Sequence, residues 1–146
     1  MDAAAATKTK NLNSYLVHAN DMPWQKTRFE GVEVKTLLID RESGLLTALV
    51  RMAPGATLPD HEHVQIEQTY VLEGSLVDKE GPDTGLTCAA GEFVWRPAGS
   101  RHVAWSPNGG LMIGMFQMPN KFHERDGRVT DMGGNDWAEV WGKVGS

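Results

Sequence analysis

The stretch GATLPDHEHVQIEQTYVLEG, residues 55–74, decides the fold that we expect for this chain of 146 residues. At its centre His61 and His63 stand two positions apart, and Glu67 follows four residues later. Side chains two positions apart on a β-strand share one face, so the two imidazoles are expected to project to the same side. A short turn before the next strand can return the Glu67 carboxylate to the same point. The spacing therefore predicts two neighbouring strands whose polar side chains converge.

Short apolar runs separated by Gly and Pro surround this stretch, from Val32 to residue 118. Residues 32–39 and 45–52 are largely apolar or β-branched and flank RESG at 41–44, which predicts a hairpin. Many short strands with such turns are typical of a β-sandwich or barrel. No segment within residues 29–118 has the 3.6-residue apolar period of an amphipathic helix. These features predict an all-β fold.

The two ends of the chain differ from this middle part. Residues 1–10 offer nothing to pack and are predicted to be a disordered tail, followed by a single domain over residues 11–146. Near the C-terminus, Asn135 can cap a short helix that places Trp137 and Trp141 on one face. We expect this aromatic segment to close the bottom of the barrel as a short lid.

The composition excludes several classes of protein. The chain has 14 Lys and Arg against 19 Asp and Glu, a net charge of −5, which argues against a nucleic-acid or anionic-membrane partner. The single cysteine, Cys88, rules out an intramolecular disulfide and zinc sites built from two or more thiolates. No apolar run approaches the ~20 residues of a membrane span. We therefore expect a cytoplasmic protein.

A third imidazole, that of His102, stands at the start of another predicted strand. Together with His61, His63 and Glu67 it offers three nitrogen donors and one oxygen donor, a set suited to a divalent transition metal. His18 and His123 lie in irregular flanks and are expected to be ordinary surface residues, with His123 the nearer of the two to a cavity mouth.

The chain also resembles the cupins, in two motifs. The first is Gly55-x₅-His61-x-His63-x₃-Glu67-x₆-Gly74, and the second is Gly91-x₅-Pro97-x-Gly99-x₂-His102. Ser106 stands where the second motif usually has Asn. The resemblance implies a double-stranded β-helix, which is a jelly-roll barrel, with one divalent metal ion held by His61, His63, Glu67 and His102.

Among cupins, the chain is most similar to the short group that includes the ChrR-type anti-sigma-factor cupin domain and the iron-dependent, acetylacetone-cleaving dioxygenases. The similarity to the dioxygenases covers most of residues 22–142. Their iron site has three histidines, so Glu67 is a departure that adds an anionic ligand and takes one open coordination position. An anti-sigma role is not expected, because those proteins use two cysteines in a separate zinc domain and this chain has only Cys88.

Three functions fit this ligand set. The first is an Fe²⁺ dioxygenase that cleaves a small enolisable dicarbonyl or hydroxy-ketone bound at the two free positions of the ion. The second is an isomerase, lyase or hydrolase that uses Zn²⁺ or Mn²⁺ as a Lewis acid, with Glu67 as the catalytic base. Weaker candidates for that base are Thr69, Arg96, Arg101 and His123. The third is a non-catalytic module that binds a metal (Ni²⁺ also fits) or a small molecule.

Alternation along the strands predicts which side chains line the barrel. Counting from Glu67, Thr69 and Val71 face inward and Tyr70 faces outward. For residues 93–96 the pattern leaves both orientations open. An apolar wall is expected from Met112, Ile113, Met115 and Phe116. The apolar hairpin of residues 32–52 would leave a long sheet edge for pairing, which predicts a homodimer that acts on a small molecule.

Overall fold

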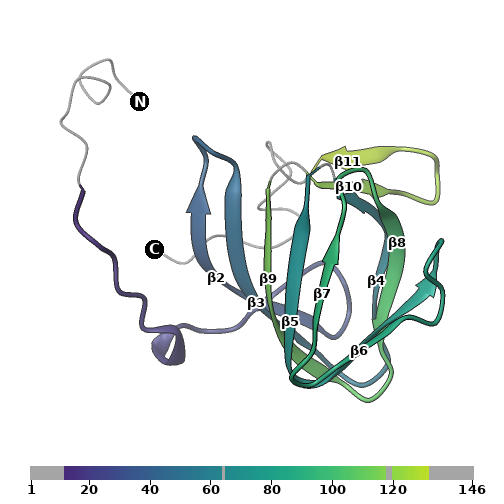
Figure 1. Ribbon diagram of the computed structural model, residues 1–146, viewed down its shortest axis with the longest axis horizontal. Helices are drawn as coiled ribbons and strands as arrows, with labels where there is room; N and C mark the ends of the chain where they lie inside the picture. Colours follow the sequence, from purple (N-terminus) through teal and green to yellow (C-terminus); the bar gives the residue numbers. More distant parts are fainter. Residues whose placement is uncertain (1–11, 64, 118–119, 132–146) are drawn as a thin grey trace.

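The computed structural model describes residues 12–63, 65–117 and 120–131, and within these ranges the protein is all-β (Figure 1). In chain order the elements are the 3-10 turn η1 (Ala19–Asp21) and the strands β1 (Gln25–Lys26), β2 (Val32–Asp40), β3 (Leu45–Met52), β4 (Ala56–His63), β5 (Glu67–Glu80), β6 (Thr87–Ala89), β7 (Phe93–Arg96), β8 (Arg101–Ser106), β9 (Gly110–Gln117), β10 (Asn120–His123) and β11 (Val129–Asp131). The predicted tail and the predicted C-terminal helix lie outside the described residues. In the described part of the chain, no helix is long and apolar enough to cross a membrane.

The strands form one curled antiparallel sheet whose two halves share β5. One half has the order β1-β2-β3-β9-β5, with β7 also paired to β5. The other half has the order β5-β8-β4-β10-β11, with β6 also paired to β5. In Figure 1 the sheet curls so that β2 and β3 lie on one side of β5, and β8 and β4 on the other. The predicted all-β jelly-roll barrel is confirmed.

The predicted hairpin of β2 and β3 is also confirmed. Gly44 ends its turn with φ +79°, and its N–H donates to the Asp40 carbonyl at 2.7 Å. Apolar side chains at alternate positions of the two strands face the barrel interior, where they join those of the other strands. The buried apolar core consists of Val32, Val34, Leu46, Ala48, Met52, Ala56, Val71, Leu76, Cys88, Ala104, Met112 and Phe116.

A β-bulge in β4 decides which of its side chains enter the barrel. Leu58 pairs with Ala104 and His61 pairs with His102, so three steps along β4 oppose two steps along β8. An extra residue in one strand shifts the alternation of every side chain beyond it. Strict alternation from Leu58 would turn Asp60 inward. The bulge instead buries His61, which is only 5% exposed.

The first half of β5 alternates as the sequence predicts. Thr69 and Val71 are buried, and Tyr70 is 42% exposed on the opposite face. Beyond Val71 the register with β9 shifts, and Gly74 then takes φ +70° where it passes the chain at Gly109. A Cβ at Gly74 would lie 1.9 Å from the Gly109 carbonyl oxygen, so no other residue fits there without moving the backbone.

The structure settles the orientation of β7, which the sequence left open. Phe93 and Trp95 are 50% and 58% exposed, whereas Arg96 is buried and Val94 is partly buried against the core. Val94 and Arg96 therefore face inward. An arginine on an inward face needs a compensating charge, because burying an unpaired charge is costly.

The expected apolar wall from β9 is only half correct. Met112 and Phe116 are buried and line the interior, with Gly114 between them. Ile113 and Met115 alternate to the other face of the strand, where they are partly exposed. The strict period of two applies here because the pairing of β9 with β3 runs without a bulge.

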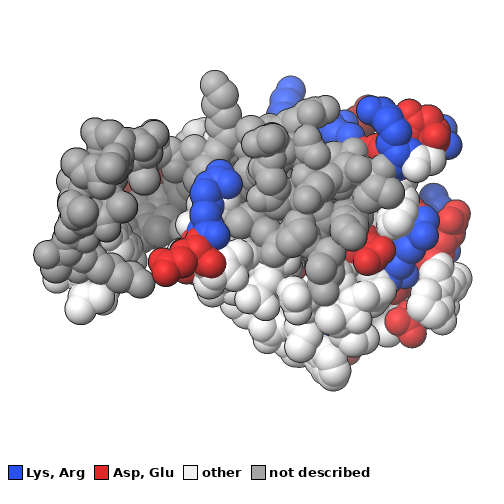
Figure 2. Space-filling model, turned by 90° about the horizontal axis from the view of Figure 1, so that it is seen from above, with Lys and Arg blue, Asp and Glu red and all other residues white. Residues whose placement is uncertain are grey.

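Charged side chains of both signs lie beside one another on the face shown in Figure 2. Ion pairs at the surface of the described residues include Arg28 with Glu124, Arg101 with Asp60, and Arg128 with Asp126. Such exposed pairs contribute about 1 kcal/mol or less each to stability.

Candidate metal centre

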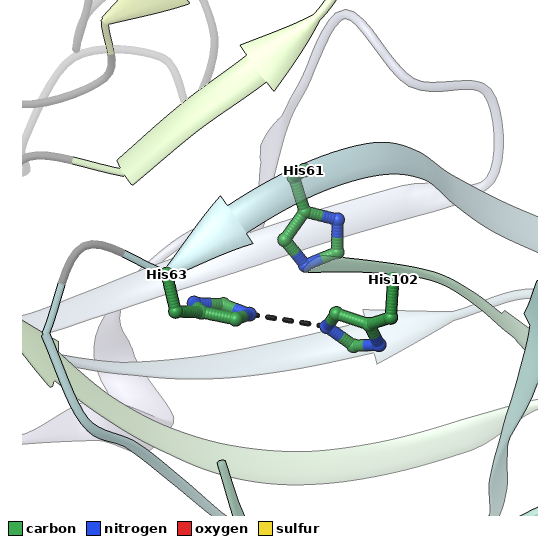
Figure 3. Close-up of side chains that lie close together, drawn as sticks. All are labelled: His61, His63 and His102. Carbon is green, nitrogen blue, oxygen red and sulfur yellow. Dashed lines mark hydrogen bonds between the residues drawn. The ribbon is translucent and has the colours of Figure 1, made fainter. Parts of the chain in front are cut away.

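Three buried histidines from two paired strands converge inside the barrel (Figure 3). His61 and His63 come from β4, and His102 comes from the neighbouring strand β8. Their exposed fractions are 5%, 1% and 4%. One ring nitrogen of each can act as a ligand, and these three nitrogens lie within 4.8 Å of one another. The closest two are the Nε2 atoms of His63 and His102, at 3.1 Å. This cluster can hold a metal ion.

Two of the three rings are oriented by hydrogen bonds on their far side. His61 Nδ1 lies 2.7 Å from the carbonyl oxygen of Pro59, within the bulge of β4. His102 Nδ1 lies 3.4 Å from Oδ1 of Asp78. Because a carbonyl and a carboxylate can only accept, we assign the proton of each neutral ring to Nδ1. The lone pair of each Nε2 is then available for a metal.

Burial keeps the His61 ring neutral. The pKa of His61 falls to about 3, mainly because burial removes its solvation and in smaller part because the rings of His63 and His102 repel a charge on it. A neutral imidazole is the form that binds a metal, so protons do not compete for His61 near neutral pH.

Glu67 begins β5 and lies against the histidine cluster. Its Oε2 is 2.9 Å from His63 Nε2, and its Oε1 accepts a hydrogen bond from the Thr69 hydroxyl at 3.2 Å. Burial acts to raise the pKa of Glu67, but the charge and the hydrogen bond of His63 outweigh it and hold the pKa below the ordinary value. Glu67 is therefore an anion beside three imidazoles.

The distances within the cluster fit a divalent ion. Metal–ligand bonds of about 2.1 Å place two adjacent ligand atoms of an octahedral ion about 3.0 Å apart. The His63–His102 and His63–Glu67 separations of 3.1 and 2.9 Å are close to that value. Bare nitrogens at this distance repel each other unless a proton or a cation lies between them. The donor set of imidazole and carboxylate is also one that Fe²⁺, Zn²⁺ and Mn²⁺ accept.

A small cavity of about 50 Å³ adjoins these ligand atoms. Its wall is mainly apolar and includes Leu58, Leu76, Met112 and Phe116. The other described lining residues are Val50, His61, His63, Glu67, Thr69, His102, Ala104 and Gly114. An apolar surface therefore lies directly beside the nitrogens of the three histidines.

Sequence reasoning missed Asp78, which is 1% exposed on the inward face of β5. Arg96 of β7 bonds both of its carboxylate oxygens, at 2.7 and 2.8 Å, and is itself 5% exposed. Burial acts to raise the pKa of Asp78, but the hydrogen bonds from His102 and Arg96 lower it overall. One signal was present in the sequence, because Asp78 follows Leu76 by two positions and so shares its buried face.

The remaining candidates for a general base divide between the inside and the outside of the barrel. Thr69 lies in the cavity beside Glu67. Arg101 is half exposed and pairs with Asp60 on the outer face of β4 and β8. His123 Nε2 lies 3.3 Å from Glu62 Oε1, also outside the barrel, in line with the expectation that His123 is an ordinary surface residue. His18 precedes η1, and its side chain is exposed as predicted.

Ser106, where the second motif departs from its usual Asn, is fully buried. Its hydroxyl donates to the Ser75 carbonyl at 2.6 Å and so joins the end of β8 to β5. The departure therefore concerns a structural contact between strands, away from the histidines.

Comparison with protein families agrees with the motifs. The family model described as the ChrR cupin-like domain matches residues 12–121. No curated protein is significantly similar to the chain in sequence.

Solved structures share the fold. A protein described as a candidate acetylacetone dioxygenase from Methylibium petroleiphilum PM1 superposes with a TM-score of 0.76 and 21% identity, covering 91% of this chain and 99% of the other. An acetylacetone dioxygenase from Acinetobacter johnsonii gives a TM-score of 0.72 and 19% identity, covering 91% of each chain. A protein of unknown function with a cupin-like fold from Ralstonia eutropha JMP134 gives 0.62 and 30%, covering 71% of this chain and 67% of that one. The first two likenesses, at these identities, establish the fold alone.

Proposed function

This chain belongs to the ChrR cupin-like domain family, and we propose that it is a metal-dependent dioxygenase that cleaves a small enolisable dicarbonyl or hydroxy-ketone. The observation that carries the proposal is the cluster of three buried histidines beside an ionised Glu67, facing a cavity with apolar walls. The likeness in fold to acetylacetone dioxygenases supports the choice of substrate class. Fold alone does not fix function, so the choice depends on the site.

His61, His63, Glu67 and His102 would hold one divalent ion, which we propose to be Fe²⁺ in the working enzyme. When bound, the ion supplies Lewis acidity and redox chemistry in a site shielded from water. The two Nδ1–H tautomers assigned above present bare Nε2 atoms to it. The Glu67 carboxylate offsets half of its charge, which favours binding inside a barrel with low polarity.

The protein's own side chains also prepare the substrate. Met112, Phe116 and Leu76 exclude water from the cavity, which strengthens each electrostatic interaction within it. Glu67 is the one carboxylate among the described lining residues, and in the dioxygenase its part is to hold the ion as an anionic ligand. Thr69 donates to one oxygen of Glu67 and thereby fixes the direction of the other.

The charge on Glu67 also supports a second candidate function. A carboxylate anion beside a Lewis-acid ion can act as the base of an isomerase, lyase or hydrolase that uses Zn²⁺ or Mn²⁺ and no O₂. The two functions differ in whether O₂ is consumed.

The test is anaerobic loading of the purified protein with Fe²⁺, followed by oxygen-electrode assays of 1,3-diketones and 2-hydroxy-ketones. We expect O₂ uptake that depends on both iron and one of these substrates. The Zn²⁺-loaded protein and the Fe²⁺-treated variant His63→Ala serve as controls and should consume no O₂. Iron-loaded protein that consumes no O₂ with any compound in the panel would contradict the dioxygenase. Conversion of a compound by the Zn²⁺-loaded protein would instead favour the Lewis-acid enzyme.

A further inference from the structure

We propose that Asp78 and Arg96 form a positioning pair for the metal centre, in which Asp78 sets the tautomer of His102 and Arg96 holds both Asp78 and Glu67. The inference rests on the proposed function for its metal site and adds two residues that the cupin motifs leave unassigned. Neither residue is expected to touch the substrate. Both act through residues that would bind the ion.

Asp78 contacts Nδ1 of the His102 ring, and His63 contacts its Nε2. Asp78 Oδ1 faces His102 Nδ1 at 3.4 Å, and both side chains are almost completely buried. A carboxylate at this place requires the proton on Nδ1, which leaves Nε2 bare toward His63. Carboxylates behind a ligating histidine fix its orientation and raise its basicity, and their loss typically lowers metal affinity ten- to a hundred-fold, as an order of magnitude.

The geometry of Arg96 extends the pair to a second proposed ligand. Its two terminal nitrogens bond the two oxygens of Asp78, which holds that carboxylate in one orientation. Its third nitrogen, Nε, is buried and has no hydrogen-bond partner among the described residues. That nitrogen lies 3.8 Å from Glu67 Oε1. One guanidinium therefore faces the carboxylates of Asp78 and Glu67, from opposite ends of β5.

The charges of the pair also affect binding of an ion. The charges of Arg96 and Asp78 cancel, so the anion left to balance a bound ion is Glu67. If Asp78 became an amide, the Arg96 cation would stand uncompensated near the ion and would attract Glu67 away from it. An amide also has one acceptor oxygen, for which Arg96 and His102 would compete. Both effects lower metal affinity, through the tautomer of His102 and through charge.

The chain offers a matched control in a second Asp–Arg pair, on the two strands β4 and β8 that carry the three histidines. Arg101 of β8 donates one hydrogen bond to each carboxylate oxygen of Asp60 on β4, as Arg96 does to Asp78. These residues adjoin His102 and His61 in sequence, but their side chains lie on the outer face and are 50% and 37% exposed. Asp60→Asn therefore removes an equivalent charge without touching a ligand ring.

The experiment measures Zn²⁺ and Co²⁺ affinity of the full chain by competition with a chromogenic chelator, with no activity assay. Asp78→Asn should bind each ion about ten- to a hundred-fold more weakly than the unmodified protein. Asp60→Asn should bind like the unmodified protein. The metal affinity of the double variant Asp78→Asn with Arg96→Met should lie between those of the two single variants. It lacks the carboxylate that fixes the His102 tautomer, but it leaves no uncompensated cation near the ion. Equal affinity in Asp78→Asn and Asp60→Asn would overturn the proposal.

A second readout, on the metal-free protein, separates positioning from a merely structural role. The ¹⁵N shifts of the His102 ring should report a single Nδ1–H tautomer in the unmodified protein and a mixture in Asp78→Asn. If Asp78→Asn does not fold, the double variant Asp78→Asn with Arg96→Met serves in its place, since it removes the carboxylate and leaves no buried cation unpaired. An unchanged His102 tautomer in the variant that folds would refute the inference. An unmodified protein that binds neither ion would refute the proposed function instead.

Discussion

At the scale of single residues, His63 differs from the other two histidines in how its ring is held. Its Nδ1 is buried without a hydrogen-bond partner among the described residues, whereas Nε2 faces both His102 and Glu67. The polar contacts of the His63 ring with other described residues therefore lie on the side of its Nε2 atom. A bound ion would contribute most to ordering this ring, which makes His63 the most informative ligand to remove.

We expect His63→Ala to lose most of the bound metal, as measured by elemental analysis after loading with one equivalent of ion. At a metal concentration 100 times Kd, binding stabilises the folded state by about 2.7 kcal/mol, and this stabilisation should disappear from the variant. Differential scanning calorimetry with and without a chelator measures it as a shift in Tm. His123→Ala, outside the barrel, is the control and should behave like the unmodified protein. Full metal occupancy in His63→Ala would contradict the ligand assignment.

Glu67→Gln distinguishes the two proposed activities. For the dioxygenase, the variant should keep Fe²⁺ on its three histidines with weaker affinity, and O₂ uptake with a diketone should persist or rise as a coordination position opens. For the Lewis-acid enzyme, turnover should stop while substrate binding remains, because the base is lost. An oxygen electrode and a metal analysis of the same sample decide between them.

The sequence predicted which histidines converge but not the Asp78 and Arg96 side chains that lie behind them. The shared face of His61 and His63 could be predicted from their spacing, because a strand places alternate residues on one face, and His102 was predicted from its place at the start of another strand. The contact between Asp78 and Arg96 joins β5 to β7 and depends on which face of β7 turns inward, a choice that periodicity left open. Spacing identifies the face of a side chain but not its partner across the barrel.

At the scale of elements, the bulge in β4 is the feature that sequence reasoning did not anticipate. The prediction that His61 and His63 share a face is correct, but alternation from Leu58 would have turned that face to solvent. Pro59 was the available signal, since proline inside a strand is confined to edges and bulges. The same bulge supplies the carbonyl that orients His61.

The two glycines of the first motif make a matched pair for testing the strand ends. Both have positive φ, +84° at Gly55 and +70° at Gly74. An added Cβ meets nothing within 4 Å at Gly55, but at Gly74 it collides with the Gly109 backbone. Gly55→Ala should cost about 1–2 kcal/mol, the usual penalty of a left-handed backbone. Gly74→Ala should cost more than about 3 kcal/mol or prevent folding, as measured by urea denaturation. Equal costs would show that the Gly109 backbone moves freely.

At the scale of the whole molecule, the barrel was predictable because turn residues and short apolar runs recur along the chain, as Gly44 and the strands beside it illustrate. The way in which β5 divides between the two halves was not, since it depends on the register shift after Val71 and the close approach at Gly74. Pairings between strands distant in sequence are set by packing of the complete sheet, beyond what a local pattern specifies.

A homodimer remains a prediction, and the edge of β2 supports it. The short strand β1 pairs with β2 only at Val34 and Glu33, so the rest of this edge has no strand partner among the described residues. Leu38, near the middle of that edge, is 44% exposed. Light scattering at micromolar concentration should give twice the 16.0 kDa of one chain. Leu38→Lys should shift the protein to monomers without unfolding it, since charges on an edge oppose pairing. A monomer in the unmodified protein would contradict the prediction.

The shared strand β5 has a consequence for amide hydrogen exchange. Its first half pairs with β9 and β7, and its second half pairs with β8 and β6, so neither half of the sheet can open without breaking it. The interior amides of β5 should therefore exchange with deuterium only when the whole molecule unfolds, at a rate that reports the global free energy of unfolding. Strands β10 and β11, at the far end of the sheet, should exchange through local opening, many times faster. Since Glu67 and Asp78 both belong to β5, the centre would rest on the part of the protein that opens last.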